Sequence, residues 1–239
     1  MYPIERAEQL NAEVTRMVVR APEIARKIKP GQFIMLRIDE RGERIPLTMN
    51  ECDPEAGTVT IVFQAVGATT MRLAQLKAGD ALLDFAGPLG NPTELEGARR
   101  ACVIGGGLGT AIAYPQAKWL HEHGCEVDVI TGFRNKDLIL LEDEIKACST
   151  RQIIMTDDGS NGNKGLVTQA LQQRSRNTHS VRLHQTIRIR FIRSMRSQRA
   201  VPIRWRTSFW MNAAARLQNF SIFWKISFAA QYRRAMRWC

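Results

Sequence analysis

The stretch 101–132, ACVIGGGLGTAIAYPQAKWLHEHGCEVDVITG, decides the fold of this chain. The apolar run 101–104 predicts a buried parallel strand, and the glycines after it predict a tight turn into a helix. That helix ends near His123 and is capped by Gly124, and the β-branched residues of 127–130 predict a second strand. Together these features predict one βαβ unit, the building block of a doubly wound sheet.

The glycines of this unit predict a binding site for a diphosphate. Glycines let the backbone turn tightly and bring N–H groups to a helix N-terminus, where the helix dipole also favours an anion. A threonine stands where the fingerprint G-x-G-x-x-G has its last glycine, so a plain glycine-rich strand-to-helix turn is the alternative. The predicted cofactor-binding residues here are Gly105, Gly106, Gly107, Gly109 and Thr110.

The tip of the second strand lacks the acidic residue that binds a ribose hydroxyl in that fingerprint. Arg134 stands there instead, either favouring a 2′-phosphate or acting as a solvated loop charge, so the sequence leaves NADH and NADPH open. A third strand is predicted over 151–155. Asp157 and Asp158 follow it, at the edge where doubly wound sheets bind ligands, and we predict that they also contact the cofactor.

The segment before residue 98 predicts an antiparallel barrel of about six short strands with glycine and proline between them. Arg44–Thr48 combines a cation, a rigid turn and a hydroxyl. Gly67–Thr70 offers backbone donors and two hydroxyls at a helix start, which suits an anion. Gly87–Pro92 predicts a rigid loop. Each also has a plain structural interpretation, as a strand start, a helix cap or a connection.

The composition changes abruptly after residue 173. Residues 1–173 contain 19 of the 34 basic residues and all 23 acidic ones, whereas 174–239 contain 15 basic residues and no acidic one. All 17 glycines lie before residue 166. An ordinary domain boundary does not show so abrupt a loss of acidic residues and glycines. We therefore predict a barrel over 1–97, an incomplete α/β domain over 98–173, and an anomalous basic tail, out of frame and disordered, over 174–239.

The cysteines indicate the compartment. There are five, an odd number, scattered and without a C-x-x-C pair. This pattern favours reduced thiols in the cytoplasm and argues against a disulfide framework or a zinc site. We also find no N-terminal signal pattern and no apolar run near the ~18 residues that a membrane span needs, so no membrane association is expected.

With these residues in view, 1–173 resembles the ferredoxin–NADP reductase superfamily. The resemblance is to the branch of the class B dihydroorotate dehydrogenase electron-transfer subunit and, more closely, the small subunit of NADH-dependent ferredoxin:NADP oxidoreductase. Five motifs in the family's order are more specific than any one of them. They are Arg44–Thr48, Ile61–Thr70, Gly87–Pro92, Gly105–Thr110 with Tyr114-Pro115, and Thr156–Ser160.

The resemblance implies that the barrel binds FAD and that the α/β domain binds NAD(P)H. It implies that Arg44 faces the FAD diphosphate and that the hydroxyl of Thr48 lies near flavin N5, so that Thr48, as the catalytic residue, positions the flavin. The other residues of the two flavin motifs are Pro46, Leu47, Gly67, Thr69 and Thr70.

The implied function is an electron-transfer flavoprotein subunit. It would pass a hydride between NAD(P)H and FAD and then electrons to an iron–sulfur partner. That partner would be the large flavin and iron–sulfur subunit of the same complex, or ferredoxin or a similar carrier. In such a subunit the cofactors undergo the hydride and electron transfer, and the protein binds them, orients them and sets their electrostatic environment.

The tail departs from this family, whose members end in a cysteine cluster that binds [2Fe–2S]. Such a cluster needs four ligands, and the tail has only Cys239, so we expect no metal ligands in this chain. A frameshift near Gln173, giving an inactive product, is one alternative to the implied function. Another is a nucleic-acid-binding protein whose tail arginines and aromatic residues contact phosphates and bases, although the missing glycines and acids favour the frameshift.

The frameshift hypothesis makes a direct prediction about the coding DNA. Nucleotides downstream of codon 173, translated in a neighbouring frame, should encode the family's Met-Met segment and its cysteine cluster. Sequencing the gene from independent clones checks this. If neither alternative frame contains these motifs, the hypothesis fails.

Overall fold

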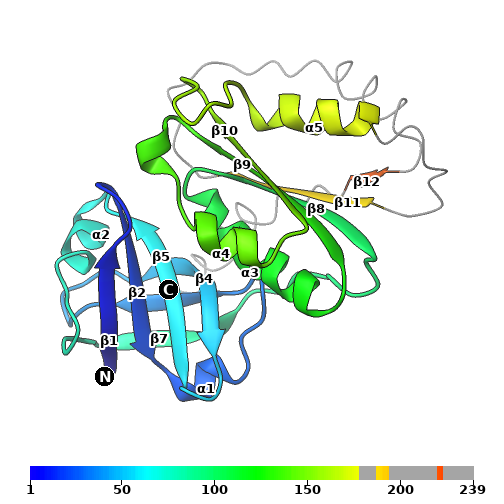
Figure 1. Cartoon of the computed structure of the whole chain (residues 1–239). Coiled ribbons are helices and arrows are strands. Elements are labelled where there is room, and N and C mark those ends of the chain that lie inside the picture. Colours follow the sequence, from blue (N-terminus) through cyan, green and yellow to red (C-terminus); the bar gives the residue numbers. More distant parts are fainter. Residues whose placement is uncertain (178–186, 194–219, 223–239) are drawn as a thin grey trace, which may run out of the picture.

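The computed structural model describes residues 1–177, 187–193 and 220–222 (Figure 1). A sheet of antiparallel strands forms an N-terminal barrel, and a parallel sheet with helices on both faces follows it. This arrangement confirms the predicted combination of a β-barrel and a doubly wound α/β domain.

The barrel is nearly closed, and its two end strands are consecutive in the chain. The sheet order is β6-β1-β2-β5-β4-β3-β7, and Leu83 alone separates β6 from β7, which lie at opposite ends of that order. The sheet has seven strands where about six were expected. The rigid loop expected from Gly87 begins later, because β7 includes Gly87. The elements are β1 Tyr2–Gln9, β2 Val14–Arg20, α1 Pro22–Ala25, β3 Phe33–Arg37, β4 Ile45–Asp53, β5 Thr58–Gln64, α2 Ala68–Leu73, β6 Ala81–Leu82 and β7 Asp84–Leu89.

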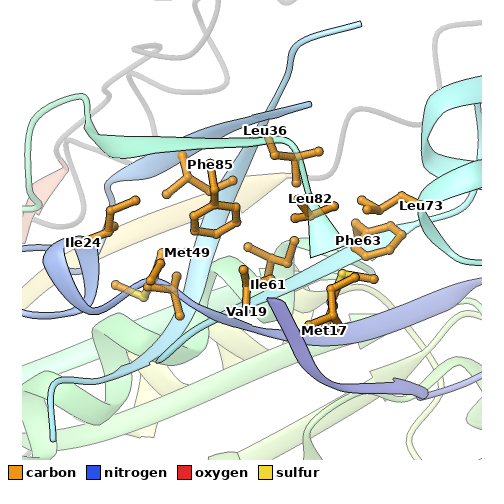
Figure 2. Close-up of a cluster of buried hydrophobic side chains, with 14 of the residues drawn as sticks. Met17, Val19, Ile24, Leu36, Met49, Ile61, Phe63, Leu73, Leu82 and Phe85 are labelled. Atoms are coloured by element: carbon orange, nitrogen blue, oxygen red, sulfur yellow. The ribbon is translucent and has the colours of Figure 1, made fainter. Parts of the chain in front are cut away.

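Alternation along β5 shows how the barrel is built. Val59, Ile61 and Phe63 are at most 1% exposed and belong to the barrel core. Figure 2 labels Ile61 and Phe63 within this core. Val62, on the opposite face of the same strand, packs with residues of the second domain instead. Because successive strand residues point to opposite faces, β5 contributes to both hydrophobic cores at once.

The second domain is a parallel sheet in the order β10-β9-β8-β11-β12. Its faces are distinguished by alternation: Val103 and Val129 pack with α3 and α4, whereas Ile104 and Ile130 pack with α5. The elements are β8 Arg100–Gly106, α3 Gly109–Glu122, β9 Glu126–Phe133, the short 3₁₀ helix η1 Lys136–Leu138, α4 Glu142–Ala147, β10 Arg151–Thr156, α5 Val167–Asn177, β11 Ile187–Arg193 and β12 Phe220–Ile222.

The structure bears on the tail in two places. Helix α5 continues through residue 173, where we expected the α/β domain to end. Strand β11 pairs in parallel with β8, and β12 pairs with β11. The remainder of the predicted tail, including Cys239 and the tryptophans of 201–239, lies outside the described residues.

The barrel contacts the second domain through α3 and α4. Val14 of β2 shares an apolar cluster with Ala111 and Tyr114 of α3. The Nη1 atom of Arg16 lies 2.7 Å from Oε1 of Glu144 in α4. Strand β4 also lies against α3 (Figure 1). The face of the sheet that carries α3 and α4 therefore faces the barrel. In the described part of the chain, no helix is both long and apolar enough to cross a bilayer.

Candidate functional site

The glycine-rich turn brings α3 very close to the end of β8. A Cβ atom at Gly105 would lie 2.8 Å from the Cα of Thr110, so only glycine allows the helix to start there. Gly107 has a φ of +53°, and its N–H donates to the carbonyl of Gly132 at 2.8 Å. No atom lies within 4 Å of the position that a Cβ at Gly107 would take. The turn is therefore tight on its inner side and open on its outer side.

The start of α3 suits an anion. Gly109 is its first residue, and Thr110 is fully buried with a hydroxyl that has no hydrogen-bond partner among the described residues. The dipole of this 14-residue helix adds positive potential at its start. The N–H groups of Thr110 and Ala111 already donate to the carbonyls of Gly107 and Leu108, each at 3.0 Å. Because β8 lies between β9 and β11, where the strand order reverses, this turn is at the topological switch point of the sheet.

The predicted residues after β9 and β10 lie at this same edge. The N–H of Asp157 donates to the carbonyl of Phe133 at 3.0 Å, and that of Asp158 to the carbonyl of Arg134 at 3.3 Å. The carboxylate of Asp158 accepts from the N–H of Ser160, which lowers the pKa of this exposed carboxyl. Both aspartates and Arg134 are exposed, so their side chains are accessible to a ligand.

Arg134 has a neighbour in the barrel. Its Nη2 atom lies 3.6 Å from Oε1 of Glu13, and 70% of its side chain is exposed. The structure therefore adds a third interpretation, a weak interdomain ion pair, to the 2′-phosphate contact and the solvated charge.

The first predicted flavin segment forms the beginning of β4. Pro46, Leu47 and Thr48 pair with Met35, Ile34 and Phe33 of β3 and are half-buried. Arg44 precedes the strand, and its Nη2 donates to Oδ2 of Asp84 at 2.8 Å. Its side chain is 53% exposed, which leaves the cation accessible.

The second predicted flavin segment lies beside the first. The hydroxyl of Thr69 donates to Oε2 of Glu43, next to Arg44, at 3.3 Å. The hydroxyl of Thr70 accepts from the N–H groups of Val66 and Gly67, each at 3.0 Å, and so closes the start of α2. The plain structural interpretation of this segment as a helix cap is thus correct, because the Thr70 hydroxyl binds the backbone at the start of α2 without any ligand.

A junction that sequence reasoning missed connects the two sites. The side-chain Nδ2 of Asn50, two residues after Thr48, donates to the carbonyl of Ala111, one residue after Thr110, at 2.7 Å. Beside it, Lys118 of α3 forms an ion pair with Glu51 of β4. A polar residue within a strand was the only sequence signal for Asn50, and it is a weak one.

The groups around this junction hold their protons. Burial and the charge of Glu51 raise the pKa of Tyr114 to about 12, so its hydroxyl stays protonated and donates to Oε1 of Glu51 at 3.5 Å. Burial also raises the pKa of the Cys148 thiol to about 11. The four described cysteines are free. Within 1–177, 187–193 and 220–222, no group of His, Cys, Asp and Glu side chains has a metal-binding arrangement.

Comparisons with known proteins agree with this architecture. An electron transfer subunit of dihydroorotate dehydrogenase B (NAD(+)) from Bacillus caldolyticus is 34% identical over 176 residues, covering 71% of this chain and 68% of that protein. The chain belongs to this family of electron transfer subunits. A solved NADH-dependent reduced ferredoxin-NADP oxidoreductase, studied for flavin-based electron bifurcation, superposes with a TM-score of 0.72 and 35% identity, covering 80% of this chain and 67% of that one.

Coverage differs among the relatives of this family. An uncharacterized protein encoded in the adh 3′ region of Clostridium beijerinckii is 40% identical over 214 residues, covering 84% of this chain and 72% of that protein. Since 84% of 239 residues exceeds 173, this match extends beyond Gln173. The chain spans only 55% of the length of an electron transfer subunit homolog from Thermotoga maritima. It spans 63% of the length of the electron transfer subunit from Streptococcus mutans. No protein-family model matches it.

The close approach at Gly105 gives a testable difference between two neighbouring glycines. Gly105→Ala should destabilise the protein by about 1–3 kcal/mol because the new methyl group overlaps the backbone of Thr110. Gly106→Ala should change stability by less than about 0.5 kcal/mol, since its Cβ would meet nothing closer than 4.0 Å. Urea unfolding of both variants measures this, and equal losses would contradict the described packing.

Proposed function

We propose that this chain is the NAD(P)H-dependent flavin subunit of a larger electron-transfer complex. FAD binds along Arg44–Thr48 and Gly67–Thr70 of the barrel, and the nicotinamide dinucleotide binds at Gly105–Thr110. The observation that carries the proposal is the bond from Asn50 to Ala111, which holds the strand of the first site against the helix of the second. Hydride transfer needs two reactants held in contact, and a direct β4–α3 junction suits that requirement.

The barrel residues fit a flavin dinucleotide. FAD, when bound, accepts a hydride from reduced nicotinamide and releases its electrons singly. Arg44 is accessible and cationic, which suits a diphosphate, and the neighbouring Asp84 fixes its guanidinium. Thr48 supplies a hydroxyl for hydrogen bonding at flavin N5, and Pro46 and Leu47 supply its apolar neighbours.

The α/β domain residues fit the second dinucleotide. The positive N-terminus of α3 binds its diphosphate, and the open side of Gly107 leaves room for it. Asp157, Asp158 and Arg134 contact the ribose end. The family relationship supports this assignment, since the similar subunits are named for NAD(+) and the similar solved structure for NADH.

The partner in this proposal is a larger subunit that accepts single electrons through iron–sulfur centres. Support comes from the names of the relatives, which are electron transfer subunits of a dehydrogenase. The nucleic-acid alternative has little support. Its tryptophans lie outside the described segments, and three of its arginines belong to β11, which pairs with β8 inside the parallel sheet.

Arg44→Ala should weaken FAD binding about 10- to 100-fold, because a charge-assisted hydrogen bond to a diphosphate contributes roughly 1.5–3 kcal/mol. Titration of the apoprotein with FAD, followed by flavin fluorescence, measures the affinity. Arg41→Ala removes an exposed cation from the same loop and should leave the affinity within about twofold. An unchanged affinity in Arg44→Ala would place the FAD diphosphate elsewhere.

Gly107→Val should abolish flavin reduction by reduced nicotinamide while leaving bound FAD in place, because the side chain fills the open side of the turn. The matched control is Gly124→Val, at the other end of α3. Gly124 also has a positive φ, +74°, and open space around its Cβ position, so its variant carries similar backbone strain. Anaerobic stopped-flow reduction compares the two. Wild-type rates in Gly107→Val would show that the dinucleotide site is misassigned.

A further inference from the structure

An irregularity in β4 places both Asn50 and Glu51 on the outer face of the barrel, between Met49 and Cys52, which face its core. Met49 pairs with Ile61 of β5, but Glu51 pairs with Thr60, so β4 contains one extra residue at Asn50. Such a bulge re-aims a side chain and is common beside functional sites. Asn50 is only 2% exposed although its side chain is polar, and its amide points to α3.

The acceptor of Asn50 is a carbonyl that α3 itself cannot satisfy. In an α-helix the carbonyl of residue 111 accepts from the N–H of residue 115. Residue 115 is a proline inside α3 and has no N–H. The Asn50 amide, at 2.7 Å, occupies the position of the missing donor. Pro115 and Asn50 thus form one arrangement, in which a proline frees a helix carbonyl and the barrel supplies its donor.

We propose that Asn50 is a positioning residue that sets the distance between the flavin and the nicotinamide by holding β4 against the first turn of α3. This deepens, and rests on, the proposed function. The bond joins Asn50, two residues after Thr48 of the proposed flavin site, to Ala111, one residue after Thr110 of the proposed dinucleotide site. The adjacent Glu51–Lys118 ion pair contributes less, because each side chain is over one-third exposed and therefore screened.

The experiment separates the hydrogen bond from its consequence for the reaction. Four proteins are compared as the full FAD-loaded chain: wild type, Asn50→Ala, Pro115→Ala and the double variant. Urea unfolding measures stability, and anaerobic stopped-flow measures flavin reduction at saturating NADH and NADPH. In Pro115→Ala, residue 115 gains an N–H that satisfies the carbonyl of Ala111 within the helix.

Stability and rate should respond differently. Asn50→Ala should lower the urea midpoint clearly when residue 115 is proline, and much less when it is alanine. The reduction rate should fall at least about tenfold in Asn50→Ala and remain low in the double variant, whose stability is restored, because the interdomain bond is still missing. Glu51→Gln, the control at the same interface, should keep the rate within about threefold.

Three results would overturn the proposal. An Asn50→Ala rate equal to wild type would show that the bond does not position the cofactors, while leaving the proposed function intact. Recovery of the rate together with stability in the double variant would show a merely structural role. If wild-type protein binds FAD but neither dinucleotide reduces it, the proposed function fails and the positioning role fails with it. In that case the urea unfolding of the four proteins still tests whether the Asn50–Ala111 hydrogen bond stabilises the fold.

Discussion

The missing side chain at Gly105 is the constraint on which the nucleotide-binding half depends. With no Cβ there, the backbone of Thr110 can approach the end of β8, and α3 can start directly above the strand. That start fixes where the positive end of the helix dipole points and where Ala111 meets the barrel. Any larger residue would move the helix, and with it both the anion site and the contact with β4.

The interface between the domains is stabilised more by burial than by charge. Val14 and Val62 of the barrel are buried in the apolar cluster of α3 and α4. The ion pairs across the interface, Arg16–Glu144 and the weaker Arg134–Glu13, remain partly exposed and are therefore screened. The Asn50 bond matters because it is buried: an unsatisfied buried carbonyl costs about 1–3 kcal/mol. The same strand therefore supplies the proposed flavin site at its beginning and the interdomain contact at its bulge.

Local sequence signals identified candidate residues but little of how the structure assembles them. The glycine-rich turn, the aspartates after β10 and the proposed flavin segments could be identified because turn residues and strand ends are encoded locally. Strand β1 was not predicted, because its sequence is largely polar and Ile4 is its only buried residue. The second half of β7 was predicted as a loop because it contains Gly87 and Pro88. The role of Asn50 could not be predicted, because its partner lies 61 residues away and the bulge in which it lies depends on pairing with β5.

The central claim is that this chain brings a reduced nicotinamide into contact with a bound flavin. The most direct measurement is the visible spectrum of the purified full chain, loaded with FAD and kept anaerobic, before and after addition of NADH or NADPH. We expect a stoichiometric flavin spectrum that bleaches on addition of at least one of the two. A folded protein that retains no flavin, or a bound flavin that neither dinucleotide bleaches, would contradict the account.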